Sequence, residues 1–89
     1  IKLKPKNLIS LGIPREYFSS GTVAIIELNG ITLKVGMNLY VEKNGDYSKV
    51  NILSLKINNQ NIDEINNGEV GVKLSSSIKN KSEFFVKQR

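Results

Sequence analysis

The sequence predicts an all-β domain: a small closed antiparallel β-barrel of six or seven strands with Greek-key connections. Apolar side chains recur at every second position in the periodic segments, as in strands with one buried face. Asn-Gly pairs, which tolerate the positive φ of tight turns, separate these segments at 29–30, 44–45 and 67–68. Eighty-nine residues leave no room for a layer of helices, so a closed barrel or a compact sandwich is expected.

The first long strand is expected at 22–28, where both faces are largely apolar, as in a central strand. After a turn at Asn29-Gly30, alternation resumes and directs Ile31, Leu33 and Val35 inward.

Gly36 should end that run, and a hairpin should follow. Leu39 and Val41 face inward on its first strand, and Asn44-Gly45 closes it. Pro14 lacks a backbone donor, so the strand preceding 22–28 should lie at an edge or be interrupted there.

The segment 47–57 is the longest predicted strand, and its apolar pattern changes phase. Val50 and Ile52 share one face, whereas Leu53 and Leu55 share the other. A regular strand cannot direct both sets into one core. We therefore predict a β-bulge or irregular backbone near Ile52-Leu53, the device by which a small barrel closes.

Two more strands are predicted toward the C-terminus. Val70, Val72 and Leu74 alternate with polar or small residues, and Phe84 and Val86 share one face of the last strand.

The composition restricts the possible functions. The chain has no cysteine and no histidine, which excludes disulfides, thiol nucleophiles, ordinary zinc sites and histidine acid–base pairs. Asp63 and Glu64 are adjacent on a polar loop, where such neighbours usually point into solvent. No histidine is present to activate a hydroxyl of Ser75–Ser77, and nothing in the sequence supports a Ser–Lys pair with Lys73 or Lys79. We therefore predict a domain that is not an enzyme, with no catalytic residue, cofactor or metal.

The sequence shows no membrane or export signal. No apolar run approaches the roughly 18 residues of a membrane span, and no signal peptide is visible. We therefore expect no membrane partner and a cytoplasmic location.

The net charge of +5 is concentrated at the two ends of the chain. Residues 1–15 and residues 73–89 each carry a net charge of +4, whereas residues 16–72 carry −3. If the fold joins the ends, they form one positive patch suited to phosphates or to an acidic partner. The alternative is that the basic ends only keep the domain in solution.

A possible interaction surface follows from these charges and from one aromatic residue. Phe84 and Phe85 point to opposite faces of one strand, so one of them lies outside the core and is available for contacts unless something covers it. The candidate residues are Lys2, Lys4, Lys6, Lys79, Lys81, Phe85, Lys87 and Arg89.

An ordered set of motifs resembles the second domain of translational GTPases, the β-barrel of elongation factor Tu and initiation factor two. Gly21-Thr22-Val23-Ala24, Glu27-Leu28-Asn29-Gly30 and Leu33-Lys34-Val35-Gly36 are similar to the opening strand and two turns of that family. Residues 50–57, 62–64 and 67–74 are similar to its second half.

The two ends of the domain resemble two narrower groups. These are small stand-alone translation-elongation-factor-like proteins and the C-terminal domain of collagenase-type, U-family bacterial peptidases. Tyr17-Phe18 precedes the opening strand as in both, and Glu83-Phe84-Phe85-Val86-Lys87 is similar to their closing strand. Met37 stands where an Asp is usual, and Asn80-Lys81-Ser82 replaces the customary Gly-Asp.

The resemblance implies a domain organisation and two functions. Residues 1–10 would be a basic lead-in and 11–89 one barrel, a fragment of a larger protein, without the GxxxxGK[ST] phosphate loop of a GTPase. Such a domain would serve a parent peptidase-like protein, contacting its catalytic domain or a protein substrate. Alternatively, it would contact tRNA or ribosomal RNA.

Overall fold

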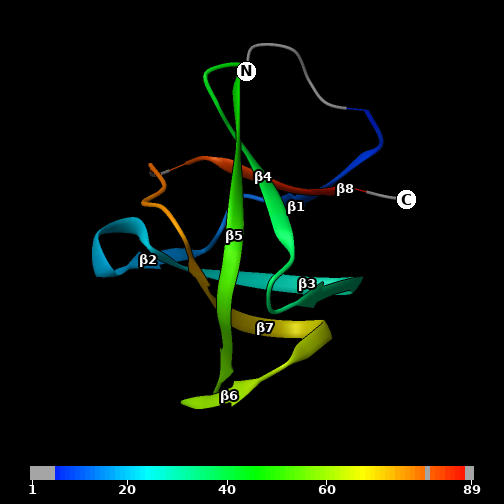
Figure 1. Ribbon diagram of the computed structural model, residues 1–89, viewed down its shortest axis with the longest axis vertical. Helices are drawn as coiled ribbons and strands as arrows, with labels where there is room; N and C mark the ends of the chain where they lie inside the picture. Colours follow the sequence, from blue (N-terminus) through cyan, green and yellow to red (C-terminus); the bar gives the residue numbers. More distant parts are fainter. Residues whose placement is uncertain (1–5, 80, 88–89) are drawn as a thin grey trace.

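The chain folds into one antiparallel sheet of eight strands in the computed structural model, which describes residues 6–79 and 81–87 (Figure 1). The strands are β1 (Leu8–Gly12), β2 (Glu16–Phe18), β3 (Val23–Lys34), β4 (Asn38–Lys43), β5 (Asp46–Ile57), β6 (Gln60–Ile62), β7 (Glu64–Leu74) and β8 (Glu83–Lys87). A 3-10 turn, Ser19–Gly21, leads into β3. Their order across the sheet is β1-β8-β4-β5-β7-β3-β2, with β6 beside β5, so the all-β prediction is confirmed.

The sheet curls because β5 takes part in two layers. Its first half pairs with β4, and its second half pairs with β7 and β6. The ladder with β7 shifts register between Ile52 and Ser54, and the side chain of the intervening Leu53 is 49% exposed. The predicted bulge is confirmed. Figure 1 shows β5 running from the layer of β1, β8 and β4 to the layer of β3 and β7.

The structure shows an open half-barrel of eight strands, which corrects the predicted strand number. Pro14 interrupts the first strand, as expected, and thereby divides it into β1 and β2. A two-residue turn at Asn58-Asn59 adds the short β6. β1 and β2 end the strand order with no ladder between them in the described residues, so closure of the barrel is not shown.

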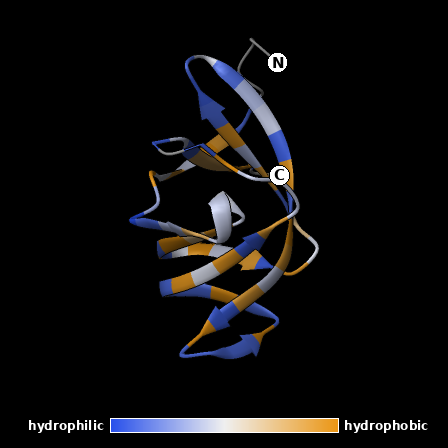
Figure 2. Ribbon diagram, turned by 90° about the vertical axis from the view of Figure 1, so that its left-hand side faces the viewer, coloured by the Kyte–Doolittle hydropathy of each residue, from blue (hydrophilic) through white to orange (hydrophobic). Residues whose placement is uncertain are grey.

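The core lies on the concave side of this sheet. Hydrophobic and hydrophilic residues alternate along the strands, as predicted (Figure 2). The buried core side chains come from five strands: Ala24, Ile26, Leu28, Leu33, Leu39, Val41, Val50, Ile52, Leu55, Val70, Val72, Leu74, Phe84 and Val86. Burying a side chain of this size is worth about 1.5–3 kcal/mol. Val35 was expected to face inward but is exposed, because it lies in the turn with Gly36.

The three Asn-Gly pairs behave differently. Asn44-Gly45 closes the β4–β5 hairpin between the paired residues Lys43 and Asp46, as predicted. The turns predicted at Asn29-Gly30 and Asn67-Gly68 are wrong, because both strands continue through these pairs. Asn29 lies opposite Asn67 in the β3–β7 ladder, and the register shifts between Asn29 and Leu33. The positive φ of Gly30 is thus accommodated in a bulge rather than in a reversal of the chain.

Gly21 allows the segment after β7 to cross the start of β3. Its φ is +88°, and a Cβ there would lie 2.5 Å from the carbonyl oxygen of Ile78. Ile78 N donates to Gly21 O at 2.9 Å, and Leu74 N donates to Thr22 O at 2.7 Å. This crossing fixes residues 75–78 against the sheet.

Candidate binding surfaces

The side chains considered for catalysis lie apart from one another. Asp63 and Glu64 are both exposed at the start of β7. The Ser75 hydroxyl accepts a hydrogen bond from Asn51 N at 2.9 Å. Within residues 6–79 and 81–87, no three acidic side chains gather where they could hold a metal ion. We therefore turn to surfaces that could bind a partner.

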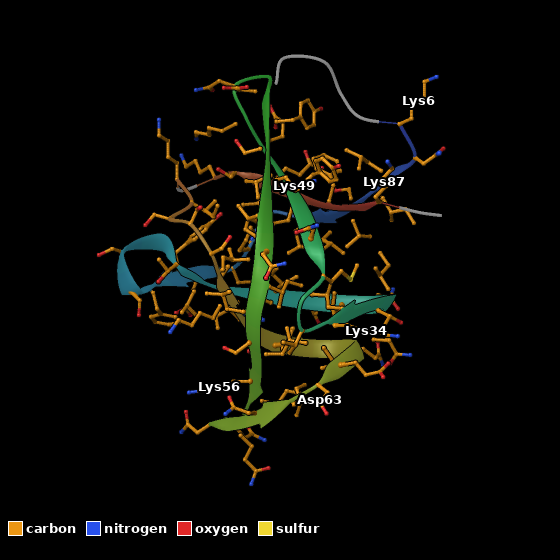
Figure 3. All side chains as sticks on the ribbon, in the orientation of Figure 1. Lys6, Lys34, Lys49, Lys56, Asp63 and Lys87 are labelled. Carbon is orange, nitrogen blue, oxygen red and sulfur yellow. The ribbon has the colours of Figure 1, made fainter. Side chains whose placement is uncertain are left out.

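The fold brings the two basic ends of the chain together. β1 pairs with β8, and Leu8 lies opposite Lys87. The antiparallel pairing places Lys6 at the Lys87 end of this ribbon (Figure 3), whereas Lys79 and Lys81 precede the other end of β8. These four lysines are exposed, and they form two groups instead of one patch. Lys2, Lys4 and Arg89 lie outside the described residues.

Phe85 does not offer the exposed surface that the sequence suggested. It lies on the opposite face of β8 from Phe84, as predicted, but its side chain is only 5% exposed. Its ring centroid is 6.0 Å from that of Tyr47, in a tilted arrangement. Phe85 is flanked by Ser10 of β1 and Tyr40 of β4 in the sheet, so neighbouring strands cover the position.

Lys79 lies in a hollow of about 430 Å³ beside the β4–β5 hairpin. Lys43 and Lys49 also line this hollow, together with Asp46 and the hydroxyls of Ser48, Ser76 and Ser77. Its charges are therefore mixed. Lys87 lines a second hollow of about 480 Å³ with Lys34, Val35 and Met37.

A third hollow, of about 510 Å³, lies on the outer face of the sheet over β3, β5 and β7. Lys56 and Lys73 line it, with Gly71 between them in the ladders. The candidate interaction residues predicted from the sequence did not include Lys34, Lys56 and Lys73. They are far apart in the sequence, and only the strand register brings them to shared hollows.

Two side-chain interactions attach β2 and the preceding residue, Arg15, to the rest of the molecule. Arg15 pairs with Glu69 at 2.9 Å, an exposed ion pair worth at most about 1 kcal/mol. The Tyr17 hydroxyl donates to Ser82 O at 3.4 Å. Partial burial raises the pKa of Tyr17 above its ordinary value of 10.0. The Arg15 charge is therefore already engaged by the Glu69 carboxylate.

The described part of the chain contains no helix long and apolar enough to cross a bilayer. Among known proteins, no protein-family model matches the chain, and no curated protein matches it either.

Proposed function

We propose that this chain is a non-catalytic binding domain of the translation-factor domain 2 type, and that it serves as an accessory barrel of a collagenase-type peptidase-like protein. In this role it presents a surface to the parent's catalytic domain or to its protein substrate. The curled antiparallel sheet carries the proposal, because the resembling motifs fall in it in the family's order. Gly21–Ala24 spans the end of the 3-10 turn and the first residues of β3, residues 50–57 lie in β5, 67–74 lie in β7, and 83–87 form β8.

Two assays on the purified protein test this function together. Incubation with fluorescently labelled gelatin should release no more fluorescence than buffer, because the chain has no cysteine nucleophile and no histidine base. When the protein is passed over a column of immobilised denatured collagen in 0.15 M salt, the column should retain it. Hydrolysis of gelatin would contradict the non-catalytic role. Elution together with a non-binding protein of the same charge would contradict contact with a collagen-type substrate and leave the parent's catalytic domain as the partner.

We propose RNA contact as the second candidate function, and one observation favours it. Phe18, on the edge strand β2, is 49% exposed and lies opposite Val23, which in turn lies opposite Lys73. Residues directly opposite one another in a ladder share a face of the sheet. An exposed aromatic ring and a lysine on one sheet face are the two components of a single-stranded nucleic-acid platform.

A salt titration of RNA binding tests this second function. Affinity for a short uridine oligonucleotide should be micromolar or tighter at 50 mM salt, and log K should fall linearly with log salt concentration. Phe18→Ala should weaken binding about fivefold or more, since stacking on one base is worth about 1–3 kcal/mol. Ile13→Ala is the matched control, because Ile13 is exposed but lies outside the strands. No binding at 50 mM salt, or equal losses in both variants, rejects the function.

A further inference from the structure

Gly71 differs from every other glycine of this chain. The chain has seven glycines, and six of them have a positive φ: Gly12, Gly21, Gly30, Gly36, Gly45 and Gly68. Gly71 does not, so its backbone conformation suits any residue. A Cβ at Gly71 would lie 3.6 Å from Ile25 Cδ1 and 3.7 Å from Lys56 O, which are ordinary contacts. Neither backbone geometry nor packing requires a glycine here.

This glycine has a cost, because glycine in a strand interior is less stable than alanine by about 0.5–1 kcal/mol. A strand glycine without a conformational reason often marks a place where a ligand approaches the backbone. The space above Gly71 is the hollow of about 510 Å³ on the outer face of the sheet. Gly71 is part of its lining, in the middle of β7.

The strand register places two lysines around this space. Lys56 of β5 lies opposite Gly71, and Lys73 lies two residues beyond Gly71 on the same face of β7. Lys56 and Lys73 are therefore diagonal neighbours, with backbones about 7–8 Å apart. Figure 3 shows the Lys56 side chain extending outward from the lower part of β5. Two like charges at this spacing repel each other, and an anion between them removes the repulsion.

The rest of the lining suits an anion. It consists of the hydroxyl residues Ser19, Thr22 and Ser54, the side-chain amide of Asn61 and the side chain of Val23, with no carboxylate. The Thr22 hydroxyl already donates to Ser19 O at 2.8 Å, so the Ser19 and Ser54 hydroxyls are the donors for an anion. Within the described residues, no carboxylate lies within ion-pair distance of Lys56 or Lys73.

The carboxylates on this sheet face lie outside the lining of the hollow. Glu69 precedes Gly71 by two residues and is held by Arg15 at 2.9 Å. Glu27 of β3 lies opposite Glu69. Glu16 of β2 lies opposite Ile25 of β3, and Ile25 in turn lies opposite Gly71. The charged side chains that line the hollow are therefore both lysines, and its floor is the backbone at Gly71, with the Ser19 and Ser54 hydroxyls beside it.

We infer that the hollow over Gly71 is a binding site for a phosphate group. Lys56 and Lys73 supply the charge, the Ser54 hydroxyl donates a hydrogen bond, and the missing side chain at Gly71 admits the group to the sheet surface. This inference goes beyond both proposed functions, because a phosphate site requires neither a parent peptidase nor RNA. The phosphate can belong to a small molecule or to a phosphodiester of an RNA strand, and the experiment distinguishes the two.

Amide NMR of the intact protein tests the site with inorganic phosphate as the probe, at constant ionic strength set with chloride. Phosphate should shift the amide signals of Lys56, Gly71 and Lys73 saturably, with a Kd in the millimolar range. Lys56→Gln and Lys73→Gln should each weaken binding at least fivefold. Lys49→Gln is the matched control, because Lys49 is exposed on the same strand as Lys56 but lines a different hollow.

Filling the hollow gives an independent test that leaves both lysines in place. Gly71→Val should abolish the phosphate-dependent shifts. If that variant does not fold, Gly71→Ala, whose Cβ makes only ordinary contacts, should weaken binding several-fold. The site is overturned if chloride alone causes the same shifts, if Lys49→Gln weakens binding as much as Lys73→Gln, or if the folded Gly71 variants bind normally.

A second titration identifies the source of the phosphate. If a uridine oligonucleotide displaces inorganic phosphate from the site, and if Lys73→Gln abolishes this competition, the ligand is a phosphodiester. Phosphate binding that the oligonucleotide does not disturb supports the same site for a small phosphorylated molecule. In that outcome the phosphate site stands even though the RNA-contact function fails.

Discussion

The two halves of β5 differ in what surrounds them, although one strand contains both. The first half, residues 46–51, pairs with β4 without a register shift and has one buried side chain, that of Val50. The second half, residues 52–57, has β7 and β6 as neighbours and buries Ile52 and Leu55 in the core. The extra residue Leu53 lies within the second half, between the buried side chains of Ile52 and Leu55. A single inserted residue thus allows both of these side chains to face the core.

Deleting Leu53 should have the largest effect, because it removes the residue that distinguishes the halves. Without it, Leu55 would point to the outer face, since a one-residue slip inverts every following side chain. The loss should exceed the roughly 5–15 kcal/mol stability of a small domain, so the variant should be unfolded by circular dichroism and NMR. A native-like spectrum would show that the bulge is dispensable.

Leu55→Ala tests the buried half directly. The substitution leaves a cavity in the core, so urea unfolding should show a loss of about 2–5 kcal/mol. Lys49→Ala in the exposed half is the control, and it should change stability by no more than about 0.5 kcal/mol. Similar losses in both variants would contradict the contrast between the halves.

Asn51→Ala tests the junction. The Asn51 side-chain amide donates to Gly36 O at 2.8 Å and to Asn38 Oδ1 at 3.2 Å. Losing both hydrogen bonds should cost about 1–2 kcal/mol in urea unfolding. Asn51→Asp keeps the shape of the side chain but lacks these donors, so it should lose at least as much. Wild-type stability in both variants would show that the junction does not depend on this amide.

Leu53→Ser should have the smallest effect. The bulge needs an extra residue, and a side chain that is 49% exposed contributes little burial. Stability should change by no more than about 0.5 kcal/mol, with the amide spectrum preserved outside residues 51–55. A loss comparable to that of Leu55→Ala would mean that Leu53 is a core residue.

The bulge was predictable from sequence because its signal is local. The apolar phase changes within 50–55, and no regular strand accommodates that change. The Asn-Gly turns were only partly predictable. The dipeptide favours positive φ, but the neighbouring strand decides whether that φ reverses the chain, as at Asn44-Gly45, or forms a bulge, as at Asn29-Gly30.

The binding surfaces were less predictable than the strands because they depend on register and coverage. Lys56 and Lys73 meet only through the β5–β7 ladder. Phe85 was assigned to a face correctly, but its burial depends on neighbouring strands that its own sequence does not identify. The joining of the basic ends was open at the sequence level, and the β1–β8 pairing decides it.

The pairing of β1 with β8 also determines when the domain can be completed. Residues 8–12 are synthesised well before their partners at 83–87. Contacts between such distant segments slow folding, typically to milliseconds or seconds. Until β8 is synthesised, the nascent chain exposes an unpaired β1 and the adjoining edge of β4, which are hazards for aggregation. Chaperone protection during translation therefore matters most for these two strands.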